Sequence, residues 1–377
     1  MKKVVLAAVV LLLCASGCKH SHPGFTKVTG ADDVSYFIKL DSITRTDTAI
    51  QFQLLREAKD GSYIVQSAAT DCSTRFALES GDQFKKDGTK LGVDPASSVN
   101  LISEVPYPSV ASSACRLASD AASFQGDFEV GKAMQVVYGN YDQKKTVSVW
   151  KQPSRVFDDH RFDSGAQVWA YPIWLEAGVE NGIEKKFLVV CNSIGEDEYS
   201  EYGDRGTCLT LSYLGAFVFA HADGKWSLES GTKLIASLEG SQLNGNLPAD
   251  LYARLYQDRP KPNDISLFHV GPNRLGINIL SVAWGGNVDT TQSQTEMWFI
   301  PTGVTVSNAL SLRSCDGESC YYTLHYSMFA GSNPEFYDVT VETKGKDLQP
   351  DERDGYRWIS MNKTETLHMY ENKYVTR

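Results

Sequence analysis

The sequence lacks the long apolar run that a membrane-spanning helix requires. The apolar stretch near the amino terminus, Val4 to Cys14, is much shorter than the roughly 20 residues needed to cross a bilayer. The chain also lacks an excess of positive charge, since 46 acidic side chains stand against 36 basic ones and the net charge is −10 at pH 7. Nucleic acids are bound by basic surfaces, so the composition predicts no nucleic-acid partner.

Common catalytic patterns are missing as well. The sequence contains neither the GxSxG element of many hydrolases nor the HExxH element of zinc proteases. Gly126–Ala133 nearly fits the phosphate-binding GxxxxGK[ST] pattern, but Ala133 stands where that loop needs a hydroxyl group for magnesium. These absences exclude the best-defined enzyme classes and predict no ATP site.

The first eighteen residues have the pattern of a lipoprotein signal peptide. Two lysines, Lys2 and Lys3, precede the apolar stretch, and the small residues Ala15-Ser16-Gly17 precede Cys18. This ending resembles a lipobox, which predicts that residues 1–17 are removed and that Cys18 becomes the acylated amino terminus. Because residue 19 is lysine and not aspartate, we expect the lipid to hold the protein in the outer membrane. Residues 18–29 are polar and are expected to form a tether.

Cysteine usage agrees with an oxidising compartment. Of the eight cysteines, Cys14 would leave with the signal peptide and Cys18 would carry the lipid. Six remain, and an even number outside the cytoplasm predicts disulfides. Six cysteines allow fifteen pairings, of which proximity in the sequence favours three sequential ones: Cys72–Cys115, Cys191–Cys208 and Cys315–Cys320. No CxxC pair occurs, so neither a metal site nor a cofactor is predicted.

The remaining pattern is typical of a mainly β protein with two domains. Ile50–Leu54 alternates apolar and polar residues as a half-buried antiparallel strand does. Apolar residues after Ser109, the expected helix cap, fall on one helical face, and Cys115 lies within that helix. We expect residues 30–122 to form an antiparallel sheet with one disulfide-tethered helix. Residues 123–165 are expected to be a linker or extension. Residues 166–377 show strands with Gly, Asp and Asn turns, which predicts a larger antiparallel sandwich or barrel-like domain.

The first domain resembles a known family. Phe37–Arg45, Ile50–Leu54, Asp71–Arg75 and the helix carrying Cys115 resemble the surface-adhesin protein E family over about residues 27–122. The resemblance implies an antiparallel sheet with one disulfide-tethered helix. The named member of that family binds host matrix and serum proteins, but the matching motifs transfer no binding residue. Residues 166–377 resemble only an uncharacterised bacterial envelope domain, which implies no function.

Two further features of the sequence are candidate functional sites. The acidic stretch 195–204 could supply oxygen ligands to calcium, although a solvated acidic loop is the simpler interpretation. His221 and His325 lie in strand patterns and could serve a hydrolase only if they converge in one pocket.

Together these observations predict a non-catalytic binding or adhesion lipoprotein of the outer membrane, with the membrane reached through Cys18 and a protein or cell-wall partner. The alternatives are a structural or inhibitor lipoprotein of the envelope and, less favoured, an exported hydrolase with a dispersed active site.

Overall fold

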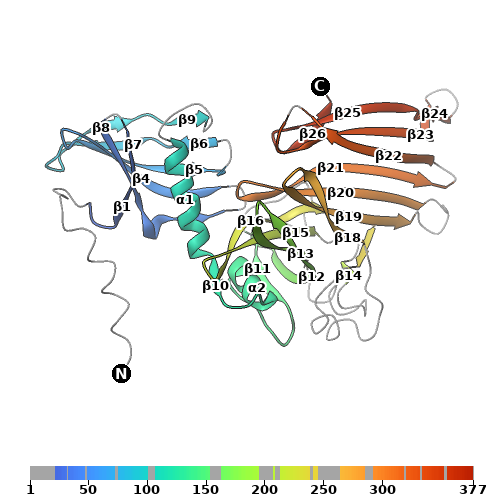
Figure 1. The fold of residues 1–377 in the computed structure, drawn as a ribbon, viewed down its shortest axis with the longest axis horizontal. Helices are drawn as coiled ribbons and strands as arrows, with labels where there is room; N and C mark the ends of the chain where they lie inside the picture. The colour runs from blue at the N-terminus through green and yellow to red at the C-terminus, as the bar shows by residue number, and fades with distance from the viewer. Residues whose placement is uncertain are drawn as a thin grey trace. The chain divides into compact units, whose positions relative to one another are not determined.

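The structure is a computed structural model of the chain. It describes residues 22–31, 33–46, 49–72, 75–100, 107–152, 163–194, 207–208, 213–237, 241–244, 264–284, 292–317, 320–331, 333–351 and 355–376. The chain divides into two compact units, Met1–Ala118 and Ser119–Arg377, and most elements of both are labelled in Figure 1. The boundary falls in the last turn of a helix, close to the expected end of the first domain at residue 122.

The first unit contains a nine-stranded antiparallel sheet and a helix. Its main strand order is β1-β2-β4-β5-β6-β9, with β3 paired to β4, β7 paired to β5 and β8 paired to β7. The helix α1 spans Tyr107–Ala121. The strands are β1 (Phe25–Ala31), β2 (Val34–Lys39), β3 (Thr44–Arg45), β4 (Ile50–Ala58), β5 (Tyr63–Thr70), β6 (Arg75–Leu78), β7 (Gly81–Phe84), β8 (Lys90–Asp94) and β9 (Ser97–Asn100).

The expected architecture of this unit is confirmed. Strand β4 buries Ile50, Phe52 and Leu54 and exposes the glutamines between them, as alternation requires. A disulfide joins Cys72 to Cys115 and so ties α1 to the sheet region.

The ends of two elements differ from the expectation. Strand β1 begins at Phe25, inside the stretch expected to be tether, because these residues pair with β2, a partner that their own pattern does not reveal. Helix α1 already includes Tyr107, so Ser109 lies inside its first turn and is not its cap. Pro108 is tolerated there because the first backbone N–H groups of a helix have no partner within the helix.

The second unit contains a six-stranded and an eleven-stranded antiparallel sheet. The six-stranded sheet has the order β10-β16-β15-β13-β12-β11. Its elements, with the helix that covers it, are β10 (Ser123–Gln125), α2 (Val130–Tyr138), β11 (Ser148–Lys151), β12 (Gln167–Glu180), β13 (Ile183–Ile194), β15 (Tyr213–Ala222) and β16 (Lys225–Ser237). Residues 123–151, which the sequence placed in a linker, therefore supply both edge strands of this sheet and its covering helix.

The eleven-stranded sheet has the main order β14-β17-β19-β20-β21-β22-β23-β25-β26, with β18 paired to β19 and β24 paired to β23. Its strands are β14 (Thr207–Cys208), β17 (Ser241–Asn244), β18 (Ile265–Gly271), β19 (Arg274–Trp284), β20 (Gln292–Thr302), β21 (Thr305–Asp316), β22 (Cys320–Ala330), β23 (Tyr337–Asp351), β24 (Gly355–Ser360), β25 (Lys363–Tyr370) and β26 (Lys373–Thr376). A disulfide joins Cys315 to Cys320 at the β21–β22 turn, as expected.

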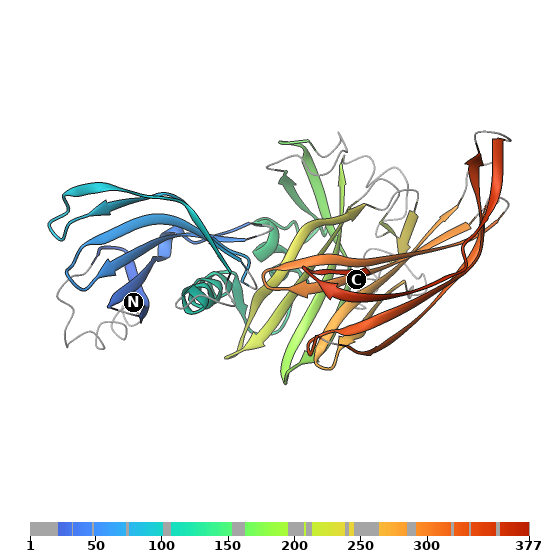
Figure 2. The same cartoon turned by 90° about the horizontal axis from the view of Figure 1, so that it is seen from above.

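The two sheets of this unit form a sandwich, which Figure 2 shows from above. Trp174 and Phe187 of the six-stranded sheet pack in one buried cluster with Ile277 and Phe299 of the eleven-stranded sheet. The opposite face of the six-stranded sheet packs against α2 in a second cluster. The second unit therefore has three layers: helix α2, the six-stranded sheet and the eleven-stranded sheet.

Candidate functional site

A hollow of about 590 Å³ lies beside the six-stranded sheet, on the face that packs against α2. This volume is within the usual range for small-molecule sites, roughly 300–1,000 Å³. The described lining residues come from the β10–α2 connection, four strands and the β15–β16 turn: Gly126, Asp127, Phe128, Leu175, Glu184, Lys186, His221, Gly224 and Trp226. We call this site the His221 hollow.

Strand alternation places the charged groups of β13. Neighbouring side chains of a strand point to opposite faces, so Glu184, Lys186 and Leu188 share one face. Leu188 is fully buried in the cluster beneath α2, which fixes the direction of that face. Glu184 and Lys186 stand on the same face, where the cluster gives way to solvent, and they line the hollow.

A tight hairpin brings His221 to Trp226. Asp223 and Gly224, between β15 and β16, have φ angles of 52° and 72°. An Asp-Gly pair suits a two-residue hairpin turn in which both central residues have positive φ. The resulting register pairs His221 directly with Trp226.

Aromatic rings form one wall of the hollow. The His221 ring is stacked on the Trp226 ring, with 4.5 Å between centroids and 16° between planes. Phe128 meets Trp226 edge-on at 5.1 Å. Lys186 Nζ lies 5.9 Å from the centre of the Trp226 ring, within reach of a cation–π contact. Trp226 is 4% exposed, so its ring is held from several sides while the imidazole remains accessible to a ligand.

The charged groups form a loose cluster around Glu184. Its Oε2 atom lies 3.5 Å from His221 Nδ1, and its Oε1 atom lies 3.9 Å from Lys186 Nζ. Both separations are longer than the roughly 2.7–2.9 Å of a charge-assisted hydrogen bond. The Glu184 side chain is 49% exposed, and Asp127 is exposed on the opposite connection. Glu184 therefore retains capacity to accept hydrogen bonds from a ligand.

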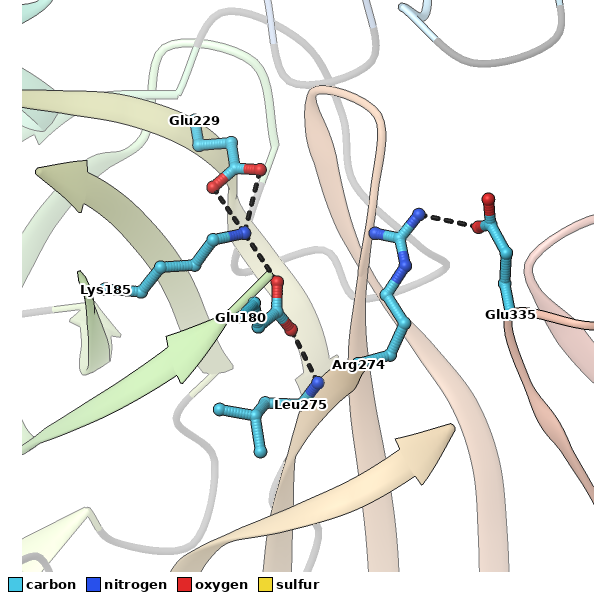
Figure 3. Close-up of polar contacts among 6 residues, drawn as sticks. All are labelled: Glu180, Lys185, Glu229, Arg274, Leu275 and Glu335. Carbon is cyan, nitrogen blue, oxygen red and sulfur yellow. Dashed lines mark hydrogen bonds and ion pairs between the residues drawn. The ribbon is translucent and has the colours of Figure 1, made fainter. Parts of the chain in front are cut away.

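The face of β13 opposite the hollow carries a buried polar network (Figure 3). Lys185 Nζ lies 2.5 Å from Glu180 Oε2 and 2.7 Å from the nearer Glu229 carboxylate oxygen. The other Glu180 oxygen accepts a hydrogen bond from the backbone N–H of Leu275 on β19. The Lys185 and Glu180 side chains are 7% and 3% exposed. This Lys185 network links the two sheets through β13, the strand that also supplies Glu184 and Lys186 to the hollow.

The structure places some of the candidate residues predicted from the sequence, and others lie outside the described ranges. His221 lines the hollow, whereas His325 lies exposed on β22 of the other sheet and is not among the described lining residues. Cys191 is disulfide-bonded. The structure does not describe the side chain of Cys208, the expected partner of Cys191. Nor does it describe the acidic stretch 195–204, residues 1–17 or Cys18.

The near-match to a phosphate loop has a structural role. Gly131 and Lys132 lie within the first turn of α2, and Lys132 pairs with Glu129 at 2.6 Å. The segment serves to start the helix that covers the sheet.

Sequence reasoning missed five charged or aromatic residues of the hollow: Asp127, Phe128, Glu184, Lys186 and Trp226. Their signal was faint. Asp223-Gly224 marked a hairpin, and a hairpin register would have placed His221 opposite Trp226, but nothing in the sequence brings Asp127 or Glu184 to that pair.

Within the described ranges, no helix combines the length and the hydropathy needed to cross a membrane. No group of three or more His, Cys, Asp and Glu side chains is arranged to hold a metal ion among the same residues.

Comparisons with known proteins give no match to the chain, whether with protein-family models, with curated protein sequences or with solved structures.

Proposed function

We propose that the protein is a lipoprotein of the outer membrane, held there by lipid on Cys18, and that it binds a ligand in the His221 hollow without transforming it. The observation that carries the binding function is the hollow itself. It has the size of a ligand site, and its wall combines stacked rings with the Glu184 carboxylate, which lies within 4 Å of both the Lys186 ammonium and the His221 imidazole. The location rests on the signal-peptide pattern ending at Cys18.

The chemistry of the hollow favours binding over catalysis. The His221 ring is fixed flat on Trp226, and Glu184 shares its carboxylate between His221 and Lys186. These contacts fix the positions of charges and rings, which is what selects a ligand. The described lining residues include no serine, threonine or cysteine to act as a nucleophile beside the imidazole.

The first unit fits an adhesion or binding role in the envelope. It has the antiparallel sheet and disulfide-tethered helix that a resemblance to the surface-adhesin protein E family implies. We propose membership of that family for this unit, with a protein or cell-wall component as its partner.

The lipid anchor is tested by metabolic labelling with a radioactive or clickable fatty acid. The wild-type chain is expected to take up label and to remain with the membrane fraction, whereas Cys18→Ala takes up none. Equal labelling of the two proteins would refute the anchor.

Ligand binding is tested by NMR with a library of small amines, carboxylic acids, sugars and short peptides. We expect at least one compound to shift the signals of both the His221 ring and the Trp226 indole. The shifts should be lost in Asp127→Trp, which places a bulky side chain at the exposed rim. A library that leaves both signals unmoved at millimolar concentration contradicts the binding function, and conversion of a bound compound to a product contradicts its non-catalytic character.

A further inference from the structure

The His221 hollow carries a formal charge imbalance. Its described lining residues include the carboxylates of Asp127 and Glu184 and the ammonium of Lys186. These three groups give the hollow one more negative than positive charge. The whole chain has a net charge of −10, so its long-range field also attracts cations.

The positive group of the hollow lies beside a carboxylate. Lys186 Nζ is 3.9 Å from Glu184 and 5.9 Å from the centre of the Trp226 ring, and the side chain is 23% exposed. An anion that approached Lys186 would also approach the Glu184 carboxylate, which repels it. Asp127, by contrast, is exposed, and no described side chain lies at ion-pair distance from it. The spare charge of the hollow is therefore negative.

The aromatic rings of the hollow also favour a positively charged ligand. The face of an aromatic ring attracts cations, and Lys186 already uses Trp226 in this way. The His221 ring is stacked on Trp226, and its side chain is 36% exposed. A planar cation could stack on the imidazole and reach the carboxylate of Glu184, whose distances of 3.5 and 3.9 Å to its present partners leave it short of close hydrogen bonds.

From these contacts we infer that the hollow binds a cationic group, an ammonium or a guanidinium, between Asp127 and Glu184 and against the His221 ring. The inference rests on the proposed binding function and names the ligand chemistry of the same site. The cationic group belongs either to a free amine or to a basic side chain of a peptide. The hollow would bind both through the same contacts.

The test compares matched probes by NMR titration. Nα-acetyl-arginine amide carries a guanidinium, and Nα-acetyl-citrulline amide replaces it with a neutral urea of nearly the same shape. Nα-acetyl-glutamate amide supplies the opposite charge. We expect the arginine probe to shift the His221 and Trp226 signals and the other two to leave them in place. Putrescine and the peptide Gly-Arg-Gly, added separately, distinguish a free amine from a peptide side chain.

Variants test whether the arginine probe binds at the carboxylates of the hollow. Glu184→Gln is expected to weaken binding of the arginine probe by about tenfold, the loss of one charge-assisted hydrogen bond, and Asp127→Asn to weaken it by a smaller factor. Glu365→Gln makes the same change of net charge at an exposed carboxylate that pairs with Lys363 on β25, and it should bind as the wild type does. Circular dichroism confirms that each variant is folded, and Asp127→Asn, in an exposed connection, keeps the test valid if Glu184→Gln does not fold.

Each result decides the matter. Equal binding of the arginine and citrulline probes, or binding of the glutamate probe alone, overturns the cation inference while the binding function stands. An equal loss in Glu365→Gln would show that net charge, and not the hollow, attracts the probe. If none of these probes shifts the hollow signals, the cation inference fails, and the wider library then decides the binding function separately.

Discussion

Lys185→Met removes an ammonium that lies between two carboxylates where the two sheets of the second unit meet (Figure 3). Methionine keeps most of the length and the apolar stem of lysine, so the change is mainly one of charge. Glu180 would remain 3% exposed with its carboxylate still bound to the Leu275 N–H but without its counter-charge. Breaking a buried ion pair in this way typically costs about 3–5 kcal/mol of unfolding free energy.

The contribution of Glu229 to this cost is small. Its side chain is 41% exposed, and solvent screens such a charge so that its pairing contributes roughly 0–1 kcal/mol. We therefore assign most of the loss to Glu180. For a unit of this size, each kcal/mol lowers the melting temperature by about 2–4 °C, which predicts a fall on the order of 10 °C for the transition of the second unit.

The assay is calorimetry together with urea unfolding followed by tryptophan fluorescence, with Lys344→Met as the matched control. Lys344 pairs with Glu342 at 3.2 Å, but its side chain is 67% exposed, so its loss should cost less than about 1 kcal/mol. Adding Glu180→Gln to Lys185→Met should restore part of the stability, because the amide keeps an acceptor for Leu275 without a buried charge. A loss in Lys185→Met no larger than in the control would refute the reasoning, as would a double variant less stable than Lys185→Met.

Three further results are expected. Cys115→Ser releases α1 from Cys72, 43 residues away, and should lower the stability of the first unit by about 4 kcal/mol; unchanged urea unfolding in Cys115→Ser and in the double serine variant would contradict this. Gly345→Ala should destabilise the β22–β23 pair by at least about 1–3 kcal/mol, because φ is +145° and a Cβ atom would lie 2.0 Å from the backbone oxygen of Tyr321; unaltered amide exchange in these strands would be the opposing result. Burial raises the pKa of Tyr374, and the nearby Asp338 carboxylate raises it further. The folded state then holds this proton more tightly than the unfolded state, so its contribution is complete below about pH 10 and is lost as the pH rises above it. The pKa values of Tyr322 and Tyr326 are also raised by burial, so absorbance at 295 nm should show several late-ionising tyrosines, one fewer of them in Tyr374→Phe.

Much of the fold could be predicted because its signals are local. Alternation in Ile50–Leu54 defines a strand that needs no knowledge of its neighbours. Proximity in the sequence was enough to pair Cys72 with Cys115 and Cys315 with Cys320. Each of these inferences uses residues that are close in the chain or constrained by a count.

Helix α2 was missed although its signals are also local. Ala133, Met134 and Tyr138 form a buried helical face, and Gly139 ends the helix with φ 78°. A C-terminal glycine with positive φ is a common helix stop. The Gly126–Ala133 stretch resembles an incomplete phosphate loop, and its helical periodicity starts only at its end. A nine-residue helix with Gly131 in its first turn gives a weak pattern, and its stability depends on packing against the sheet.

The hollow could not be predicted because it depends on register between strands. The pairing of β13 with β15 sets Lys186 opposite Phe219, and the pairing of β15 with β16 sets His221 opposite Trp226. A shift of one residue in either pairing would send half of these side chains to the other face of the sheet. Asp127 reaches the hollow from the β10–α2 connection, and no pattern in the strands predicts where that connection lies.

Strand β13 joins the two charged sites of the second unit through three consecutive residues. Glu184 and Lys186 face the hollow, and Lys185, between them, points to the other face and into its buried network. The backbone that positions the hollow charges is therefore held by an ion pair that the hollow does not touch. If this pair fixes the end of β13, Lys185→Met should weaken binding in the hollow at a temperature where the variant is still folded, although no lining residue has changed. Comparison with Glu184→Gln separates loss of a lining charge from loss of support for β13. Glu184→Gln should abolish the preference for the arginine probe over the citrulline probe. Lys185→Met should reduce affinity for the arginine probe and leave that preference intact.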